Sequence, residues 1–214
     1  MAPKPTQLVE FLTGLKVQAS AKRLAKYLAS YDGGEFETYG TNDPYRVTGD
    51  DLVAVTYLSL EIRNKSRSGI STRTARALED HRGQIAALLR DVPPQLALSD
   101  LDGDAFNRHL GPQSAASRLY VFLRSDEIGL PRVATSKLLA RKRPSLLPVF
   151  DSVTGKAAGT KSSEGWWQLW WEALHENPGL VDHLCQIRSA AGANAAHLSV
   201  LRTADIAIWM TANS

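Results

Sequence analysis

The chain has 214 residues, of which 43% are apolar, and this is enough to bury a substantial core. Its 25 Lys and Arg residues exceed its 22 Asp and Glu residues only slightly, so the net charge of +3 permits a polyanionic partner without requiring one. The single cysteine, Cys185, excludes an internal disulfide framework and a four-cysteine zinc or iron–sulfur site. We expect a buried thiol in a helix there.

No apolar stretch approaches the roughly 18 residues needed to cross a bilayer, and the start of the chain lacks the apolar segment of a signal peptide. We therefore expect a cytoplasmic protein without a membrane partner. The five histidines show neither helical i, i+4 ligand spacing nor a matching carboxylate motif. The sequence predicts no metal site and no cofactor.

Apolar residues recur at three-to-four spacing along most of the chain, and alternating runs of β-branched residues are missing. This pattern predicts an all-α fold, a compact multi-helix bundle of about ten helices that forms a single domain over residues 1–214. We expect a monomer.

The first helices are expected near 6–15 and 18–30, and a long polar connection follows from Tyr31 to Arg46. A capping box at Thr48 then opens an apolar helix, which we expect to be the buried centre of the fold. A basic loop leads from there into a helix that starts at Ser71 or Thr72 and ends before Pro93. Basic residues cluster in this part of the chain, at Arg63, Lys65, Arg67, Arg73 and Arg76.

Further helices are expected near 99–110, 114–125 and 132–143. A short helix opened by Asp151, one from about 163 to 176, one after Pro178 and one near 198–211 complete the chain. In the last of these, Arg202 and Asp205 lie one turn apart among apolar residues. That spacing favours a partly buried ion pair over a catalytic role.

The segment from Ile128 to Asp151 gives the clearest indication of function. Gly129, Leu130 and Pro131 predict a tight turn, because glycine adopts backbone angles closed to other residues and proline suits the first turn of a helix. Such a turn presents backbone amides at the positive end of a helix dipole, where a DNA phosphate would bind.

Between Ile128 and Phe150 there is no acidic residue and there are five basic ones, namely Arg132, Lys137, Arg141, Lys142 and Arg143. We expect double-stranded DNA as the partner of this patch. The contacts would come from the turn and from Arg132, Thr135, Ser136, Lys137 and Arg141. From the residues alone, a solvated basic helix face is an equally good interpretation.

The turn, the basic helix and the later Pro148-Val149-Phe150-Asp151 resemble the helix-hairpin-helix DNA glycosylase superfamily, in which a hairpin of the form L-P-G-V-G precedes P-V-D. The resemblance covers about 25 residues. It implies a helix-hairpin-helix element at 120–160, with Asp151 as the catalytic aspartate. Three blocks, DDLVAVTYLSL, SKLLARKRPSLLPVFDSV and SVLRTADIAIWM, also resemble an uncharacterised actinobacterial family, which implies no activity.

The segment departs from the glycosylase pattern in three ways. Pro131 replaces the second hairpin glycine, one extra residue separates Val149 from Asp151, and Val133 stands where bifunctional members carry a Schiff-base lysine. The resemblance therefore implies a monofunctional DNA N-glycosylase, which excises a damaged or modified base and leaves an abasic site. Its setting would be repair or defence against modified foreign DNA, and its location the nucleoid.

Breaking the N-glycosidic bond develops oxocarbenium character on the sugar, which an ionised carboxylate stabilises while it aligns a water. Asp151 is the candidate, and it could also cap its helix. A flipped-out base needs a pocket with aromatic walls. Candidates for that pocket lie in or beside the long connection, at Tyr31, Asp32, Tyr39 and Tyr45.

Four tryptophans, Trp166, Trp167, Trp170 and Trp171, share one helical face, which favours core packing over base stacking. Two other functions stay open. One is a non-enzymatic helix-hairpin-helix DNA-binding protein. The other is a helical scaffold for a protein partner, in which the tryptophans would form the interface.

Overall fold

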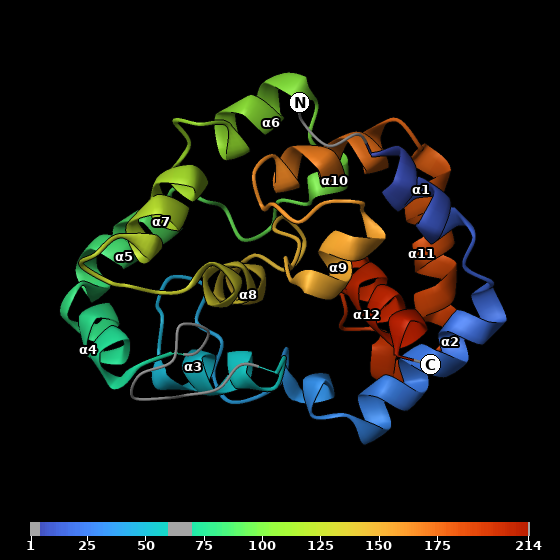
Figure 1. Ribbon diagram of the computed structural model, residues 1–214, viewed down its shortest axis with the longest axis horizontal. Helices are drawn as coiled ribbons and strands as arrows, with labels where there is room; N and C mark the ends of the chain where they lie inside the picture. Colours follow the sequence, from blue (N-terminus) through green and yellow to red (C-terminus); the bar gives the residue numbers. More distant parts are fainter. Residues whose placement is uncertain (1–4, 60–69, 214) are drawn as a thin grey trace. The chain divides into compact units, whose positions relative to one another are not determined.

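A computed structural model describes residues 5–59 and 70–213 (Figure 1). In these ranges every regular element is a helix, so the predicted all-α fold is confirmed. The chain divides into two compact units that interleave along the sequence. Unit 1 comprises residues 1–31, 97–101 and 144–214, and unit 2 comprises residues 32–96 and 102–143. That the whole chain acts as a single domain stays a prediction.

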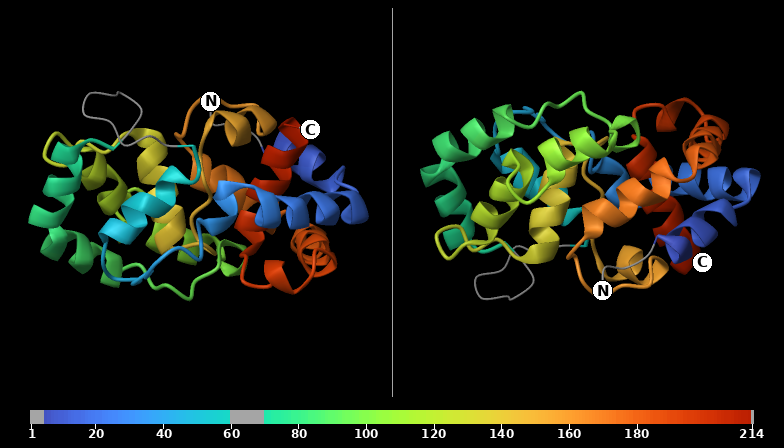
Figure 2. Two further views of the ribbon diagram at one scale, coloured as in Figure 1. Left: turned by 90° about the horizontal axis from the view of Figure 1, so that it is seen from below. Right: turned by 90° about the horizontal axis from the view of Figure 1, so that it is seen from above.

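Unit 1 is built around three long helices, α2 (Val17–Ser30), α11 (Pro178–Ala190) and α12 (Val200–Ala212), which pack against one another (Figures 1 and 2). The other helices of this unit are α1 (Thr6–Thr13), α9 (Ser152–Ala157), α10 (Trp166–His175) and the short 3-10 helices η2 (Leu98–Asp100) and η3 (Ala193–Ala195). Every residue of α12 from Leu201 to Ile208 is buried, so α12 forms the centre of unit 1.

The predicted ion pair in α12 is confirmed. The Arg202 guanidinium contacts the Asp205 carboxylate, and both side chains are buried. Arg202 also donates to the Tyr27 hydroxyl of α2 at 3.2 Å, which satisfies a second polar group in the same interior. Core packing of the tryptophans is confirmed for Trp166 and Trp170, which are buried, while the other two tryptophans of α10 are half-buried.

Unit 2 contains η1 (Asp32–Glu35), α3 (Gly49–Thr56), α4 (Thr72–Asp80), α5 (Arg82–Arg90), α6 (Gly103–Leu110), α7 (Ala115–Arg124) and α8 (Arg132–Lys142). Its central helix is α8, which packs against α3 and α7 (Figure 1). All its residues from Ala134 to Lys142 are buried. The expectation that the helix after Thr48 forms the centre is therefore wrong for unit 2, where α8 takes that place.

Several element boundaries differ from the sequence prediction. The helix expected to run from Ser71 to Pro93 is two helices, α4 and α5, which meet at His81. The His81 ring, at the break between the two helices, lies edge-on against Phe122 of α7, with ring centroids 5.5 Å apart. The helix α3 ends at Thr56, ahead of Ser59 with its positive φ of 60°.

None of the described helices combines the length and apolarity required to span a membrane. The described residues also hold no group of three or more His, Cys, Asp or Glu side chains arranged to bind a metal ion. Cys185 lies on α11 and is half-buried, less enclosed than expected.

Candidate nucleic-acid interface

The basic residues at the C-terminal end of α8 point into unit 2. Arg141, Lys142 and Arg143 are each 2% exposed or less. A surface patch was expected here, and that expectation is wrong for these three residues. Their charge compensates polar groups of the protein, so it is not available to a phosphate in solution.

Asp51 is the acidic partner of this buried cluster. Its carboxylate is fully buried and accepts from Arg141 Nε at 2.9 Å, and it lies 2.5 Å from Lys142 Nζ. It also accepts from the Thr48 backbone amide at 2.8 Å, so the predicted capping box is present. Burial lowers the pKa of the Lys142 amine, and the hydrogen bond to Asp51 opposes that shift.

Arg143 lacks a carboxylate partner among the described residues and is held by carbonyl groups. It donates to the carbonyls of Val92 at 2.5 Å and Pro44 at 2.8 Å, and to that of Leu89 in the last turn of α5. Arg143 therefore caps the C-terminus of α5, where a cation also suits the helix dipole. Burial lowers its pKa to about 10, which leaves the guanidinium charged at neutral pH.

The same cations hold the long connection between Phe36 and Tyr45. Arg141 donates to the backbone carbonyls of Phe36 and Tyr39, the latter at 2.5 Å, and Lys142 donates to the carbonyl of Asp43 at 3.0 Å. This connection is thus fixed by backbone hydrogen bonds to buried charges. It was predicted only as a polar loop.

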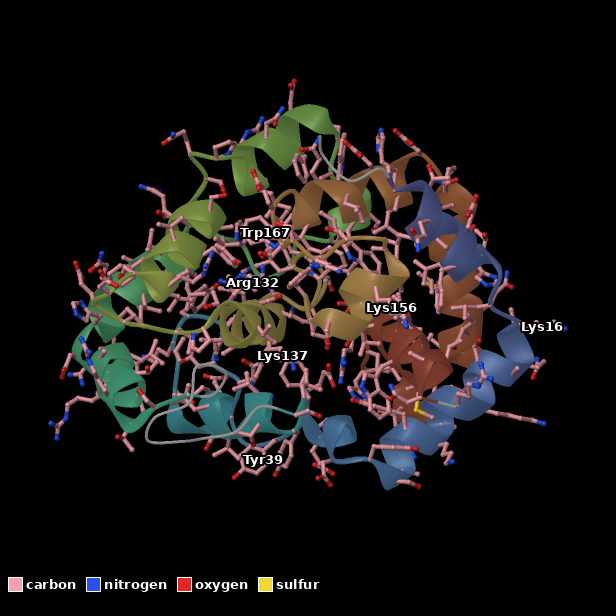
Figure 3. All side chains as sticks on the ribbon, viewed as in Figure 1. Lys16, Tyr39, Arg132, Lys137, Lys156 and Trp167 are labelled. Atoms are coloured by element: carbon pink, nitrogen blue, oxygen red, sulfur yellow. The ribbon has the colours of Figure 1, made fainter. Side chains whose placement is uncertain are left out.

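Two of the predicted base-pocket residues lie on this connection. Tyr39 packs edge-on against Tyr57 at the end of α3, with centroids 5.4 Å apart, and Figure 3 shows Tyr39 beside that helix. Tyr45 is 39% exposed and lies over the Arg143 guanidinium at 6.0 Å. The exposed ring of Tyr45 is therefore held by a cation beneath it.

Four of the predicted DNA-contacting side chains are buried, so their placement in an exposed DNA-contacting face is corrected. Thr135 is fully buried and its hydroxyl donates to Leu130 and Pro131 carbonyls of its own turn. Lys137 is 4% exposed, lies on the α3 side of α8 (Figure 3) and donates to the Leu58 carbonyl. Ser136 is 6% exposed, and Arg141 is bound to Asp51 as described.

The turn before α8 has the backbone conformation that its sequence predicts. Gly129 has a φ of 71°, in the left-handed region that glycine tolerates best, and Pro131 is the N-cap of α8. However, the Gly129 and Leu130 amides donate to backbone carbonyls at the end of α7, to Ser125 at 2.7 Å and to Leu123 at 3.0 Å. Leu130 is also buried. The donors left for a ligand are therefore the first-turn amides of α8 itself.

The start of α4 lies next to this turn. The Thr74 hydroxyl, in the first turn of α4, donates to the Gly129 carbonyl at 3.4 Å. Figure 2 shows the turn beside the beginning of α4. Arg73 and Arg76 of α4 and Arg132 of α8 are exposed. We call the exposed residues Arg73, Arg76, Gly129 and Arg132 the α4/α8 face.

The arginines of the α4/α8 face lie at helix N-termini, where a positive charge opposes the helix dipole. Both helices lack an acidic residue in their first turn, where a carboxylate would be stabilising, and carry Arg73 and Arg132 there instead. In α4 the acids Glu79 and Asp80 stand at the C-terminal end, which is also the unfavourable end for them. Two positive helix ends with added arginines thus adjoin one another, and this arrangement attracts an anion.

Asp151 is the N-cap of α9 in unit 1. Its Oδ1 accepts from the amides of Val153 and Thr154, both at 2.9 Å, and lies 3.2 Å from the Thr154 hydroxyl. Within the described part of the chain, Oδ2 has no hydrogen-bond partner. The side chain is half-buried, so solvent reaches it. Asp151 therefore caps α9, which was one of its two expected roles. In the described chain its Oδ2 accepts no hydrogen bond.

The surroundings of Asp151 within unit 1 are apolar on one side. Phe150 packs edge-on against Trp166 with centroids 5.1 Å apart, and Trp166 Nε1 donates to the Val149 carbonyl at 3.1 Å. Tyr31, also of unit 1, stacks on Tyr27 at 5.7 Å. Asp32 is an exposed residue of η1 in unit 2. Tyr39 and Tyr45 thus belong to unit 2, and Tyr31 belongs to unit 1.

Sequence analysis missed Asp51 and Arg143. The sequence predicted a capping box at Thr48, without a further role for its acid Asp51, and included Arg143 only as one of several basic residues. The pattern offered one clue, because Arg141 and Lys142 stand in the last turn of α8 and Arg143 is its C-cap, where basic side chains favour nearby carbonyl groups. The predicted basic residues Arg63, Lys65 and Arg67 lie outside the described residues.

Almost the whole chain matches the model of one protein family. Residues 20–212 match the model of a Family of unknown function (DUF6308). The chain belongs to this family. A search of curated proteins and a search of solved structures each gave no match.

Proposed function

We propose that this member of the DUF6308 family binds the backbone of double-stranded DNA through its α4/α8 face. The observation that carries this proposal is the pairing of two helix N-termini whose first turns each contain an arginine and no acid. Phosphate oxygens accept from first-turn amides and from arginine, and such contacts position a protein on DNA without reading sequence.

The helix dipole does not account for Arg73 in the first turn of α4. A cation in the first turn of a helix opposes the dipole and costs a few tenths of a kcal/mol, up to about 1 kcal/mol. Binding a phosphate at the same place turns that cost into a favourable interaction. The buried cations at the other end of α8 add rigidity to the helix that carries Arg132.

Salt-dependent binding to a short duplex tests this proposal. The double variant Arg73→Glu/Arg132→Glu should weaken binding at least about tenfold at low salt and reduce the slope of log K against log salt by about 2. The matched control Lys22→Glu/Lys26→Glu makes the same change of net charge on exposed residues of α2. Equal loss in both double variants, or no binding by the unmodified protein, would contradict the proposal.

We propose further that the protein is a monofunctional DNA N-glycosylase in which Asp151 is the catalytic residue. In this step the bond between C1′ and the base nitrogen breaks, a water oxygen bonds to C1′, and the base leaves with a proton. A half-buried aspartate with an oxygen to spare supports the role of orienting that water. Lys137, the nearest lysine in sequence to the expected Schiff-base position, is buried and donates to a carbonyl.

The activity test uses Asp151→Asn, because asparagine is as good an N-cap as aspartate. Duplexes with a panel of altered bases, treated with alkali after incubation, should break with the unmodified protein and stay intact with this variant. Asp102→Asn is the matched control, since Asp102 caps α6 through a 2.7 Å bond from the Ala105 amide. A panel that yields no abasic sites, or equal activity in Asp151→Asn, contradicts the enzymatic proposal.

One observation favours a second function, a DNA-binding protein without catalysis. The three hydrogen-bond contacts of Asp151 Oδ1 within α9 are sufficient to account for an aspartate at this position. In that case the unmodified protein binds duplex DNA through the α4/α8 face and releases no base. The two experiments above separate these functions, because the first measures binding alone.

A further inference from the structure

We propose that unit 1 contains a binding site for a small oxyanion, with a phosphate group as the ligand. The site is a cavity of about 220 Å³ in front of the N-terminus of α12. Its lining includes Arg188, His197 and the first residues of α12, and it contains no Asp or Glu. The inference does not rest on the proposed DNA binding, because every residue that lines this cavity belongs to unit 1.

Arg188 supplies a positive charge without a counter-charge. Its Nη1 donates to the Leu198 carbonyl at 2.6 Å and its Nη2 lies 3.6 Å from Cys185 Sγ, which orients the guanidinium. In the described part of the chain no carboxylate lies within ion-pair distance of it. Because a guanidinium has five N–H donors, three stay available. A half-buried arginine in an acid-free cavity is favourable when an anion shares the cavity.

The start of α12 adds backbone donors to the same cavity. Ser199 is the N-cap, and its Oγ accepts from the Arg202 amide at 3.0 Å and donates to the Pro144 carbonyl at 2.6 Å. The amides of Val200 and Leu201, which line the cavity, have no acceptor in the described chain. The helix has 13 residues and no acid in its first turn, so its dipole is positive toward the cavity.

The size and polarity of the cavity define the class of ligand. A volume of about 220 Å³ is below the 300–1,000 Å³ that is typical of sites for drug-sized molecules. Ser99 lines the cavity too, but its hydroxyl donates to Asp100 at 2.8 Å, outside the lining. Arginine, histidine and helix amides supply several donors in different directions, which suits the several oxygens of a phosphate group better than a single halide ion.

Inorganic phosphate is the probe for the first experiment, with isotope-labelled full-length protein followed by NMR. The amide signals of Val200 and Leu201 should shift with increasing phosphate and saturate, whereas chloride at equal ionic strength should leave them in place. Signals from α1 serve as the reference for nonspecific effects. Unmoved Val200 and Leu201 signals at high millimolar phosphate overturn the proposal without any need for a variant.

The second experiment uses Arg188→Gln, which removes the charge and keeps an N–H donor for the Leu198 carbonyl. Phosphate affinity should fall at least about tenfold, since a hydrogen bond to a charged group contributes this much. Arg90→Gln, at an exposed arginine of α5, is the matched control and should bind phosphate like the unmodified protein. Equal affinity in both variants overturns the assignment.

A third measurement distinguishes the two sources of such a phosphate. A phosphomonoester such as glycerol phosphate competes with inorganic phosphate if the ligand is a free metabolite, and Arg188→Gln then leaves duplex binding unchanged. If the ligand is a phosphate of the DNA backbone, the duplex displaces inorganic phosphate, and Arg188→Gln weakens duplex binding. Lack of competition by both overturns the site.

Discussion

The two ends of α8 carry the same kind of side chain in opposite surroundings. At its N-terminal end, Arg132 is exposed next to the turn at Gly129 and the start of α4. At its C-terminal end, Arg141 and Arg143 are buried, the first against Asp51 and the second against carbonyl groups. Basic residues of one helix can thus be exposed to solvent at one end and buried in the core at the other. The difference lies in which partners the fold brings near each residue.

The largest loss of stability is expected when Asp51 is replaced. Asp51→Ala removes the acid from two buried cations, and such a loss typically costs about 3–5 kcal/mol of the free energy of unfolding. Urea unfolding measures it. The matched control is the neighbouring Asp50→Ala, where only a hydrogen bond from the Thr41 amide is lost, at about 1 kcal/mol. Equal destabilisation by the two variants would show that the C-terminal end of α8 is not an electrostatic core.

The second prediction concerns Arg143, which has no acidic partner among the described residues. Arg143→Met leaves the carbonyls of Leu89, Val92 and Pro44 without their donor, so we expect a loss of about 2–3 kcal/mol. Arg90→Met, at an exposed arginine, should change stability by less than about 0.5 kcal/mol. A neutral result at Arg143 would mean that water satisfies these carbonyls equally well.

At the other end of α8, the effects should be smaller. Gly129→Ala forces a residue with a Cβ into a φ of 71° and should destabilise the protein by about 1–2 kcal/mol, although space around the site is open. Gly83→Ala, in a helix and with nothing within 4 Å, should be stabilising instead. Thermal unfolding compares the two, and effects of the same sign would contradict the assigned turn.

The smallest expected effect is a gain in stability. Arg132→Glu places an acid in the first turn of α8 and should stabilise the protein slightly, by about 0.5 kcal/mol or less. Arg124→Glu removes a cation from the last turn of α7, where it lies over the Tyr120 ring at 5.3 Å, and should destabilise it. Chemical unfolding at low salt resolves both. Destabilisation by Arg132→Glu would indicate that this arginine is kept for the fold.

The comparison also explains which parts of the fold could be predicted from the sequence. Local patterns predict most of the helices, and α8, for example, begins one residue after Pro131 and ends within one residue of the predicted end. The capping roles of Thr48 and Asp151 were predicted for the same reason, because a cap depends on residues within three positions. The contacts of Lys137 and Arg143 depend on residues more than 50 positions away and could not be predicted.

The candidate site also combines features that were predicted from local sequence with features that depend on distant contacts. The turn at Gly129 was predicted as a contact to a phosphate, and its conformation is as expected. The role of Arg73 was not predicted, because only the contact between Thr74 and Gly129 places α4 beside α8. The cavity next to α12 was also missed, since its lining comes from five separate stretches of the chain.

The sequence by itself determined the all-α class, most helix boundaries, the capping residues and the ion pair between Arg202 and Asp205. All of these follow from hydrophobic period and from interactions within about one helical turn. Only the tertiary structure decided which arginines face solvent and which are buried. A guanidinium can be stabilised by water, by a carboxylate or by carbonyl groups, and the composition of its own helix does not distinguish among these partners.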